Sequence, residues 1–137
     1  MNKAIKFLLF LSFLACDADE DELQILVETD KTEYLVNEDI QVSISNLSEK
    51  SAYYFRCDNV DLSPSHILRF EKIRWQEEEQ FYLCTFRGPS GFIGSLAQGS
   101  TEIDLTSLEK RGMYRLRYEF KIDGVRRYYE SNMFKIR

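Results

Sequence analysis

Residues 113–122 alternate so regularly between apolar and polar side chains that they restrict the chain to a β fold. The apolar side chains occupy every second position, namely Tyr114, Leu116, Tyr118, Phe120 and Ile122. The other positions hold Met113 and four charged side chains. Such a period of two predicts a β-strand with one buried and one solvated face.

An Asp-Gly pair at 123–124 follows this strand and predicts a two-residue hairpin turn, because Gly accepts the positive φ that such turns need. This turn pairs Tyr118 with Tyr129. In an uninterrupted ladder, Phe134 near the end of the chain would then face outward. We therefore predict a bulge near residues 130–132, since one inserted residue reverses the direction of every side chain after it.

Further strands are predicted from residue 23 onward, where alternating segments are separated by turns roughly every 8 to 12 residues. They cover residues 23–27, 40–44, 52–55, 67–75, 80–85 and 103–105. We expect the polar segment 76–79 to turn the chain between the fourth and the fifth of them. The pattern predicts an all-β fold, either a sandwich or a barrel.

The strand and turn residues also form a longer pattern, which consists of Tyr34, Glu38, Ile40, Val42, Ile44, Asn46, Ser48, residues 112–115, Ser131, Asn132, Phe134 and Ile136. This pattern resembles bacterial immunoglobulin-like domains and is similar to the bacterial intracellular proteinase inhibitor family. The resemblance implies an immunoglobulin-like, two-sheet antiparallel β-sandwich of about seven strands over residues 23–137, without catalytic residues.

The N-terminal segment has the character of a targeting signal. It begins with two lysines, continues as an apolar run at 7–14 and ends in Ala15 and Cys16. This order is typical of a secretory signal, and the run is too short to span a bilayer. The ending resembles a bacterial lipoprotein signal, which implies removal of residues 1–15 and lipid attachment at Cys16. A signal that is cut nearby, with Cys16 unmodified, is the alternative.

The charge of the chain favours an envelope protein over a nucleic-acid binder. The 137 residues carry a formal charge of −5, whereas nucleic-acid binders are normally basic.

Five of the six residues at 17–22 are acidic, which predicts a solvated tether. Such a stretch resembles a surface-export signal in some bacteria, although Asp17 resembles an inner-membrane retention signal in others. We expect a lipid-anchored protein of the bacterial envelope, at the outer membrane or the cell surface.

Two further cysteines suggest a disulfide. With Cys16 assigned to lipid, Cys57 and Cys84 form an even pair outside the reducing cytoplasm, where a bridge is the simplest state. The two cysteines with His66 as zinc ligands, or residues 58–61 as a calcium site, are weaker interpretations because the spacing of a metal motif is missing. We expect no cofactor.

The last hairpin carries a candidate binding site. The basic residues Arg115, Arg117, Lys121 and Arg126 share the solvated face of the last hairpin, which suggests a patch for anionic glycans, lipid head groups or an acidic envelope partner. A solvated sheet face that resists edge-to-edge aggregation is the simpler interpretation. Glu119 and Glu130, which lies opposite Arg117, neutralise part of this patch.

We therefore expect a non-enzymatic, lipid-anchored binding or structural module of unknown oligomeric state. The first alternative is a protease inhibitor that acts through an exposed loop at 88–99, although a crossover between sheets is the simpler interpretation of that loop. The second is a small hydrolase that uses His66 with nearby Ser and Asp residues.

Replacing the predicted lipidation site tests the anchor. In Cys16→Ser the sulfur that accepts the lipid is absent, so we expect the protein to leave the membrane fraction. Cell fractionation with an immunoblot measures this loss. Retention of Cys16→Ser in the membrane fraction, at the level of the wild type, would contradict a lipid anchor.

Overall fold

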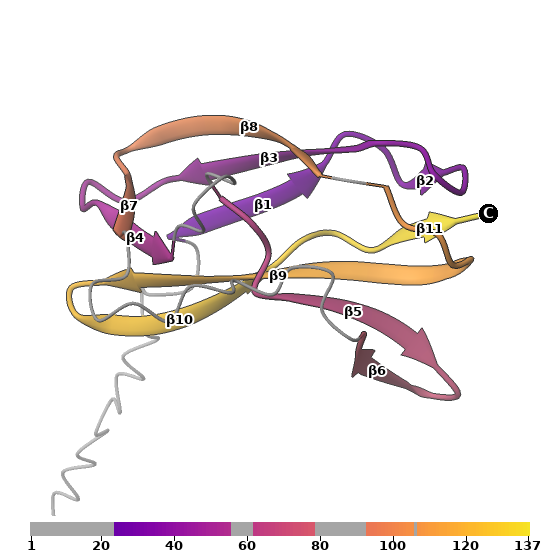
Figure 1. Ribbon diagram of the computed structural model, residues 1–137. Helices are drawn as coiled ribbons and strands as arrows, with labels where there is room; N and C mark the ends of the chain where they lie inside the picture. Colours follow the sequence, from indigo (N-terminus) through magenta and orange to yellow (C-terminus); the bar gives the residue numbers. More distant parts are fainter. Residues whose placement is uncertain (1–23, 56–61, 79–92, 106) are drawn as a thin grey trace, which may run out of the picture.

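The described structure, a computed structural model, covers residues 24–55, 62–78, 93–105 and 107–137, and it is entirely β in these ranges. Two sheets face each other (Figure 1), which confirms the all-β, two-sheet prediction. The strands are β1 (Ile25–Thr29), β2 (Glu33–Tyr34), β3 (Ile40–Asn46), β4 (Ala52–Phe55), β5 (His66–Glu71), β6 (Arg74–Glu77), β7 (Ile93–Leu96), β8 (Gly99–Leu105), β9 (Gly112–Ile122), β10 (Val125–Glu130) and β11 (Phe134–Ile136).

The longest strand, β9, organises the larger sheet. It pairs with β10 and β11 along one edge, and with β4 and β5 along the other. β7 extends the sheet beside β4, β6 extends it beside β5, and β2 pairs with β11 in parallel. The smaller sheet has the order β1–β3–β8. Eleven strands and one parallel pair exceed the seven antiparallel strands expected, and this strand order does not confirm an immunoglobulin-like topology.

The core lies between β9 and the central strand of the smaller sheet. Leu116, Tyr118 and Phe120 on β9 have no exposed surface, and neither have Val42 and Ile44 on β3. Each side chain of this class contributes roughly 1.5 to 3 kcal/mol when it is fully buried. The predicted one-sided burial of β9 is therefore confirmed.

The hairpin turn is also confirmed. Asp123 and Gly124 both have positive φ, at 50° and 78°, as the tight turn requires. Tyr118 pairs with Tyr129, as expected from a two-residue turn.

A one-residue bulge follows β10 at the predicted place. Glu130 pairs with Arg117 and Phe134 pairs with Tyr114, so four steps along this side match three along β9. Within the bulge, Ser131 fills the gap in the ladder, because its N–H donates to the Leu116 carbonyl at 2.8 Å and its hydroxyl accepts from the Leu116 N–H at 3.0 Å. The shift brings Phe134 into the core, where it is fully buried.

The next residue of the bulge joins the two sheets. The Asn132 amide accepts a hydrogen bond from the Thr29 N–H and donates one to the Thr29 hydroxyl, both at 2.8 Å. Thr29 ends β1 of the smaller sheet. One side chain therefore connects a sheet edge to the bulge that sets the register of the other sheet.

The predicted strand at 67–75 and its turn at 76–79 were wrong. The chain turns earlier, at Lys72 and Ile73, and the hairpin of β5 and β6 pairs Glu71 with Arg74. Lys72 takes a φ of 56° although it is not one of the usual turn residues, so local composition held no signal. The predicted strand at 80–85 lies outside the described residues.

The segment expected as a loop holds structure from residue 93 onward. β7 belongs to the larger sheet and β8 to the smaller one, so the chain crosses between sheets at 97–98. The crossover interpretation is confirmed for this part, and β8 begins four residues before the strand predicted at 103–105.

Removing the Asn132 amide tests the link between the sheets. In Asn132→Ala the Thr29 N–H loses its partner, so we expect the free energy of unfolding to fall by about 1 to 3 kcal/mol. Urea denaturation measures the change. The neighbouring Met133 is 47% exposed, and Met133→Ala is the control, with an expected change below about 0.5 kcal/mol. Equal stability of the two variants would contradict the link.

Candidate functional site

Several predicted sites lie outside the described residues. These are the lipid site Cys16, the acidic tether at 17–22, the disulfide pair Cys57 and Cys84, the calcium candidates at 58–61, and the part of the 88–99 segment before residue 93. The lipid anchor and the disulfide therefore stay predictions, and the site is built from the last hairpin.

The four basic residues of the predicted patch share the outer face of the β9–β10 hairpin. Lys121 pairs with Arg126 across the two strands, and Glu130 lies opposite Arg117 as expected. Arg115 and Arg117 alternate along β9 with fully buried Leu116. The four do not act alike, however, because their partners divide them into two pairs.

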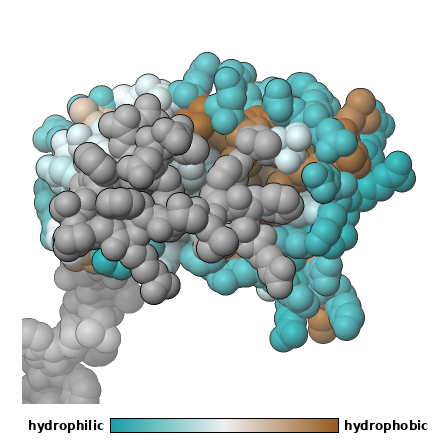
Figure 2. Space-filling model, viewed as in Figure 1, coloured by the Kyte–Doolittle hydropathy of each residue, from teal (hydrophilic) through white to brown (hydrophobic). Residues whose placement is uncertain are grey.

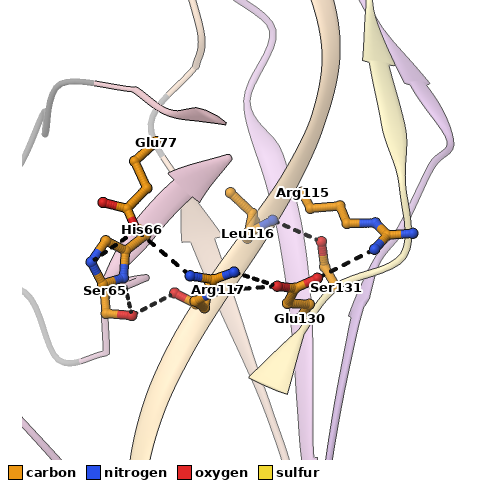
Figure 3. A network of polar contacts seen from close by, with 8 residues as sticks. All are labelled: Ser65, His66, Glu77, Arg115, Leu116, Arg117, Glu130 and Ser131. Carbon is orange, nitrogen blue, oxygen red and sulfur yellow. Dashed lines mark hydrogen bonds and ion pairs between the residues drawn. The ribbon is translucent and has the colours of Figure 1, made fainter. Parts of the chain in front are cut away.

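Arg115 and Arg117 share one carboxylate (Figure 3). The Glu130 oxygens lie 2.8 Å from Arg117 and 3.3 Å from Arg115. Partial burial favours the neutral form of Glu130, but hydrogen bonds and charge from the two guanidinium groups outweigh it and hold the pKa of this carboxyl below its ordinary value. The two arginines are therefore cross-links within the sheet.

Both arginines also contact aromatic rings. The Arg115 guanidinium lies 4.9 Å from the ring centre of Trp75 on β6, and Arg117 lies 5.9 Å from that of Tyr128 on β10. Arg117 also lies 3.6 Å from Glu77 on β6. These contacts connect β9 to its neighbour β10 on one side and, across β5, to β6 on the other. They occupy charges that the sequence analysis placed in a ligand patch.

The histidine considered for hydrolysis lies beside the same network. Nδ1 of His66 is 3.0 Å from the Ser65 hydroxyl, and Nε2 is 3.8 Å from Glu77 (Figure 3). The Ser65 hydroxyl donates to the Arg117 carbonyl at 3.0 Å. A nucleophilic serine gives that proton to its histidine, so this geometry fixes the start of β5 against β9 and does not activate Ser65.

Lys121 and Arg126 line a hollow at the other end of the hairpin. Its volume is about 380 Å³, and Tyr53 and Tyr54 of β4 line it together with Phe120, whose side chain is fully buried. Arg126 is 3.3 Å from Glu119, which also lines the hollow. The three arginines of the predicted patch form ion pairs, whereas Lys121 forms none within the described ranges. Its ammonium group is therefore available to a ligand.

A glycine on the neighbouring strand makes room for one wall. Gly94 on β7 pairs with Tyr54, and a Cβ atom at this position would lie 2.3 Å from the tyrosine ring. The ring therefore lies over the glycine backbone, where any side chain would displace it.

Sequence reasoning found the cations of this hollow and missed its aromatic wall. β4 meets β9 in the single pair Tyr53 with Lys121, a contact between residues far apart in sequence. The Tyr53-Tyr54 dipeptide was the available signal, but nothing local indicates which strand it would face.

The outer face of the smaller sheet has the opposite charge. Glu28 on β1, Ser43 on β3 and Glu102 on β8 lie side by side across it, with Asp104 further along β8. Among the residues that the structure describes, no group of three His, Cys, Asp or Glu side chains is arranged to hold a metal ion. The same residues contain no helix long and apolar enough to cross a membrane.

Comparison with known proteins finds no relative. No family model matches the chain, and no curated protein or solved structure matches it significantly.

Neutralising Glu130 tests whether Arg115 and Arg117 are structural. The lowered pKa means that its ion pairs stabilise the fold fully above the ordinary Glu pKa of about 4.3, and that this contribution is lost as the pH falls through the lowered value. We expect Glu130→Gln to lower the free energy of unfolding at pH 7 by up to about 1 kcal/mol, since the pairs are partly exposed.

Urea denaturation of both proteins between pH 7 and pH 3 measures this, with the outer-face variant Glu102→Gln as the control. We expect the difference between Glu130→Gln and wild type to disappear at the acidic end. A difference that does not depend on pH would show that the charge of Glu130 is not what stabilises the hairpin.

Proposed function

We propose that the protein is a non-enzymatic, lipid-anchored module of the bacterial envelope that binds an anionic glycan in the hollow beside the β9–β10 hairpin. The observation that carries this proposal is the combination of aromatic walls with Lys121 and Arg126 in one hollow. Its volume of about 380 Å³ falls within the roughly 300 to 1,000 Å³ typical of small-ligand sites.

The chemistry of the wall suits a sugar that carries a carboxylate or a sulfate. Sugar rings have apolar C–H faces that pack on aromatic rings, and Tyr53 is 47% exposed. The ammonium group of Lys121 supplies a charge-assisted hydrogen bond to the anion. Glu119 holds Arg126 in place, and its carboxylate accepts hydrogen bonds from sugar hydroxyls.

Charge on the opposite sheet favours binding on the side of the hollow. The acidic outer face of the smaller sheet, around Glu28 and Glu102, repels a polyanion. Repulsion at wrong sites contributes to specificity as much as attraction at the right one. A long anionic glycan is therefore directed to the larger sheet.

The two alternative functions receive less support from the described residues. The inhibitor interpretation needs a protruding loop, and the segment from residue 93 onward is strand except for the crossover at 97–98. The hydrolase interpretation needs an activated serine, and the Ser65 hydroxyl donates to a backbone carbonyl.

Binding measurements on hollow variants test the proposal. We expect Lys121→Ser to weaken the binding of a uronic-acid oligosaccharide about tenfold, the effect of losing one hydrogen bond to a charged group. Isothermal titration calorimetry measures the dissociation constant, and Tyr53→Ala tests the aromatic wall in the same way.

Two controls make the result specific. Lys135→Ser removes an exposed lysine from β11 of the same sheet, outside the hollow, and should bind like the wild type. A neutral oligosaccharide of the same length should bind more weakly than the charged one. Equal effects of Lys121→Ser and Lys135→Ser, or no binding of any anionic glycan, would overturn the proposal.

A further inference from the structure

The hairpin of β5 and β6 presents an apolar tip between two cations. Ile73 lies in the turn and is 91% exposed, more than any other large hydrophobic side chain among the described residues. Lys72 and Arg74 flank it, and both are exposed. At this exposure the Ile73 side chain contributes no hydrophobic burial to the fold.

Aromatic rings support this tip. Phe70 and Trp75 pair across the hairpin with their ring centres 5.3 Å apart, and Phe70 is 45% exposed. The hairpin extends away from the smaller sheet (Figure 1), and the lowest described surface in Figure 2 is hydrophilic around a small apolar tip. Exposed apolar and aromatic side chains with adjacent cations are the composition that binds at a membrane interface.

We propose that the β5–β6 hairpin is a second membrane contact, in which Ile73 enters the interface of an anionic bilayer while Lys72 and Arg74 bind its headgroups. This inference rests on the proposed lipid anchor at Cys16. The anchor keeps the hairpin at a high effective concentration near the bilayer, so a contact too weak to bind alone is occupied.

The length of the tether limits how the domain lies. Seven residues, and so eight Cα-to-Cα steps, separate Gln24 from Cys16 and span at most about 28 Å, whereas the eleven residues of β9 span about 35 Å. Ile25 pairs with Asn46 near the β9–β10 turn, and the hairpin tip lies at the opposite end of β9, beyond the pair of Arg69 with Tyr114. Anchor and tip therefore attach to the bilayer from opposite ends of β9.

Charge favours contact at the tip. Lys72 and Arg74 are exposed at the turn, whereas Glu28, Glu102 and Asp104 lie on the outer face of the smaller sheet. An anionic surface attracts basic residues and repels acidic ones within about one Debye length, roughly 8 to 10 Å at ordinary salt.

The single tryptophan of the chain provides the test. Trp75 lies two residues from Ile73, so its fluorescence reports the depth of the hairpin without a label. The lipidated protein is reconstituted into phosphatidylglycerol-containing vesicles in which part of the lipid carries bromine near the headgroup. We expect bromine to quench Trp75 at least twofold, and the quenching to decline in phosphatidylcholine vesicles and at high salt.

Variants separate insertion from mere proximity. Ile73→Asp should lose most of the quenching, whereas Leu35→Asp, which changes a 55% exposed leucine elsewhere, should retain it. Circular dichroism checks that both variants fold. Flotation of the vesicles separates the two hypotheses, because a protein that fails to float contradicts the Cys16 anchor. A protein that floats with Trp75 unquenched, or with Ile73→Asp quenched like the wild type, overturns the hairpin contact.

Discussion

The structure depends on the burial of one face of β9. This strand pairs with four others, and its apolar side chains face the fully buried Val42 and Ile44 of the smaller sheet. The chain after the hairpin returns to the same strand, and it reaches the core only because one extra residue in the bulge reverses its side chains. Ser131 repairs the ladder at that step, and Asn132 uses the same step to bind β1.

The outer face of β9 is divided along its length. Near the middle, Glu130 neutralises Arg115 and Arg117, which also contact rings of β6 and β10, so these charges serve the fold. Toward the hairpin turn, Lys121 and Arg126 border an aromatic hollow. One alternating strand thus supplies a structural network and a proposed ligand site, and what separates them is the position of Glu130. The proposed membrane contact at Ile73 lies at the other end of the strand.

Features that depend on sequence neighbours could be predicted, and features that depend on distant pairing could not. Alternation indicated β9, the Asp-Gly pair indicated its turn, and side-chain parity at the end of the chain indicated the bulge. The turn at Lys72 was missed because its positive φ has no compositional signal. The hollow was missed because it requires β4 to meet β9, a contact that no local pattern encodes. The outward position of the basic residues and the place of Glu130 opposite Arg117 were predictable, but the contacts of Arg115 with Glu130 and Trp75 were not, because they depend on how distant strands pack.

The most direct test of ligand binding at the hairpin end is a ¹H–¹⁵N NMR titration of the protein with a uronic-acid oligosaccharide. The proposed site predicts dose-dependent shifts of the amides of Tyr53, Lys121 and Gly124, which line the hollow, with little change at Glu28 and Glu102 on the opposite sheet. Shifts confined to other parts of the molecule, or no shifts at saturating oligosaccharide, would contradict the assignment of this hollow as the binding site.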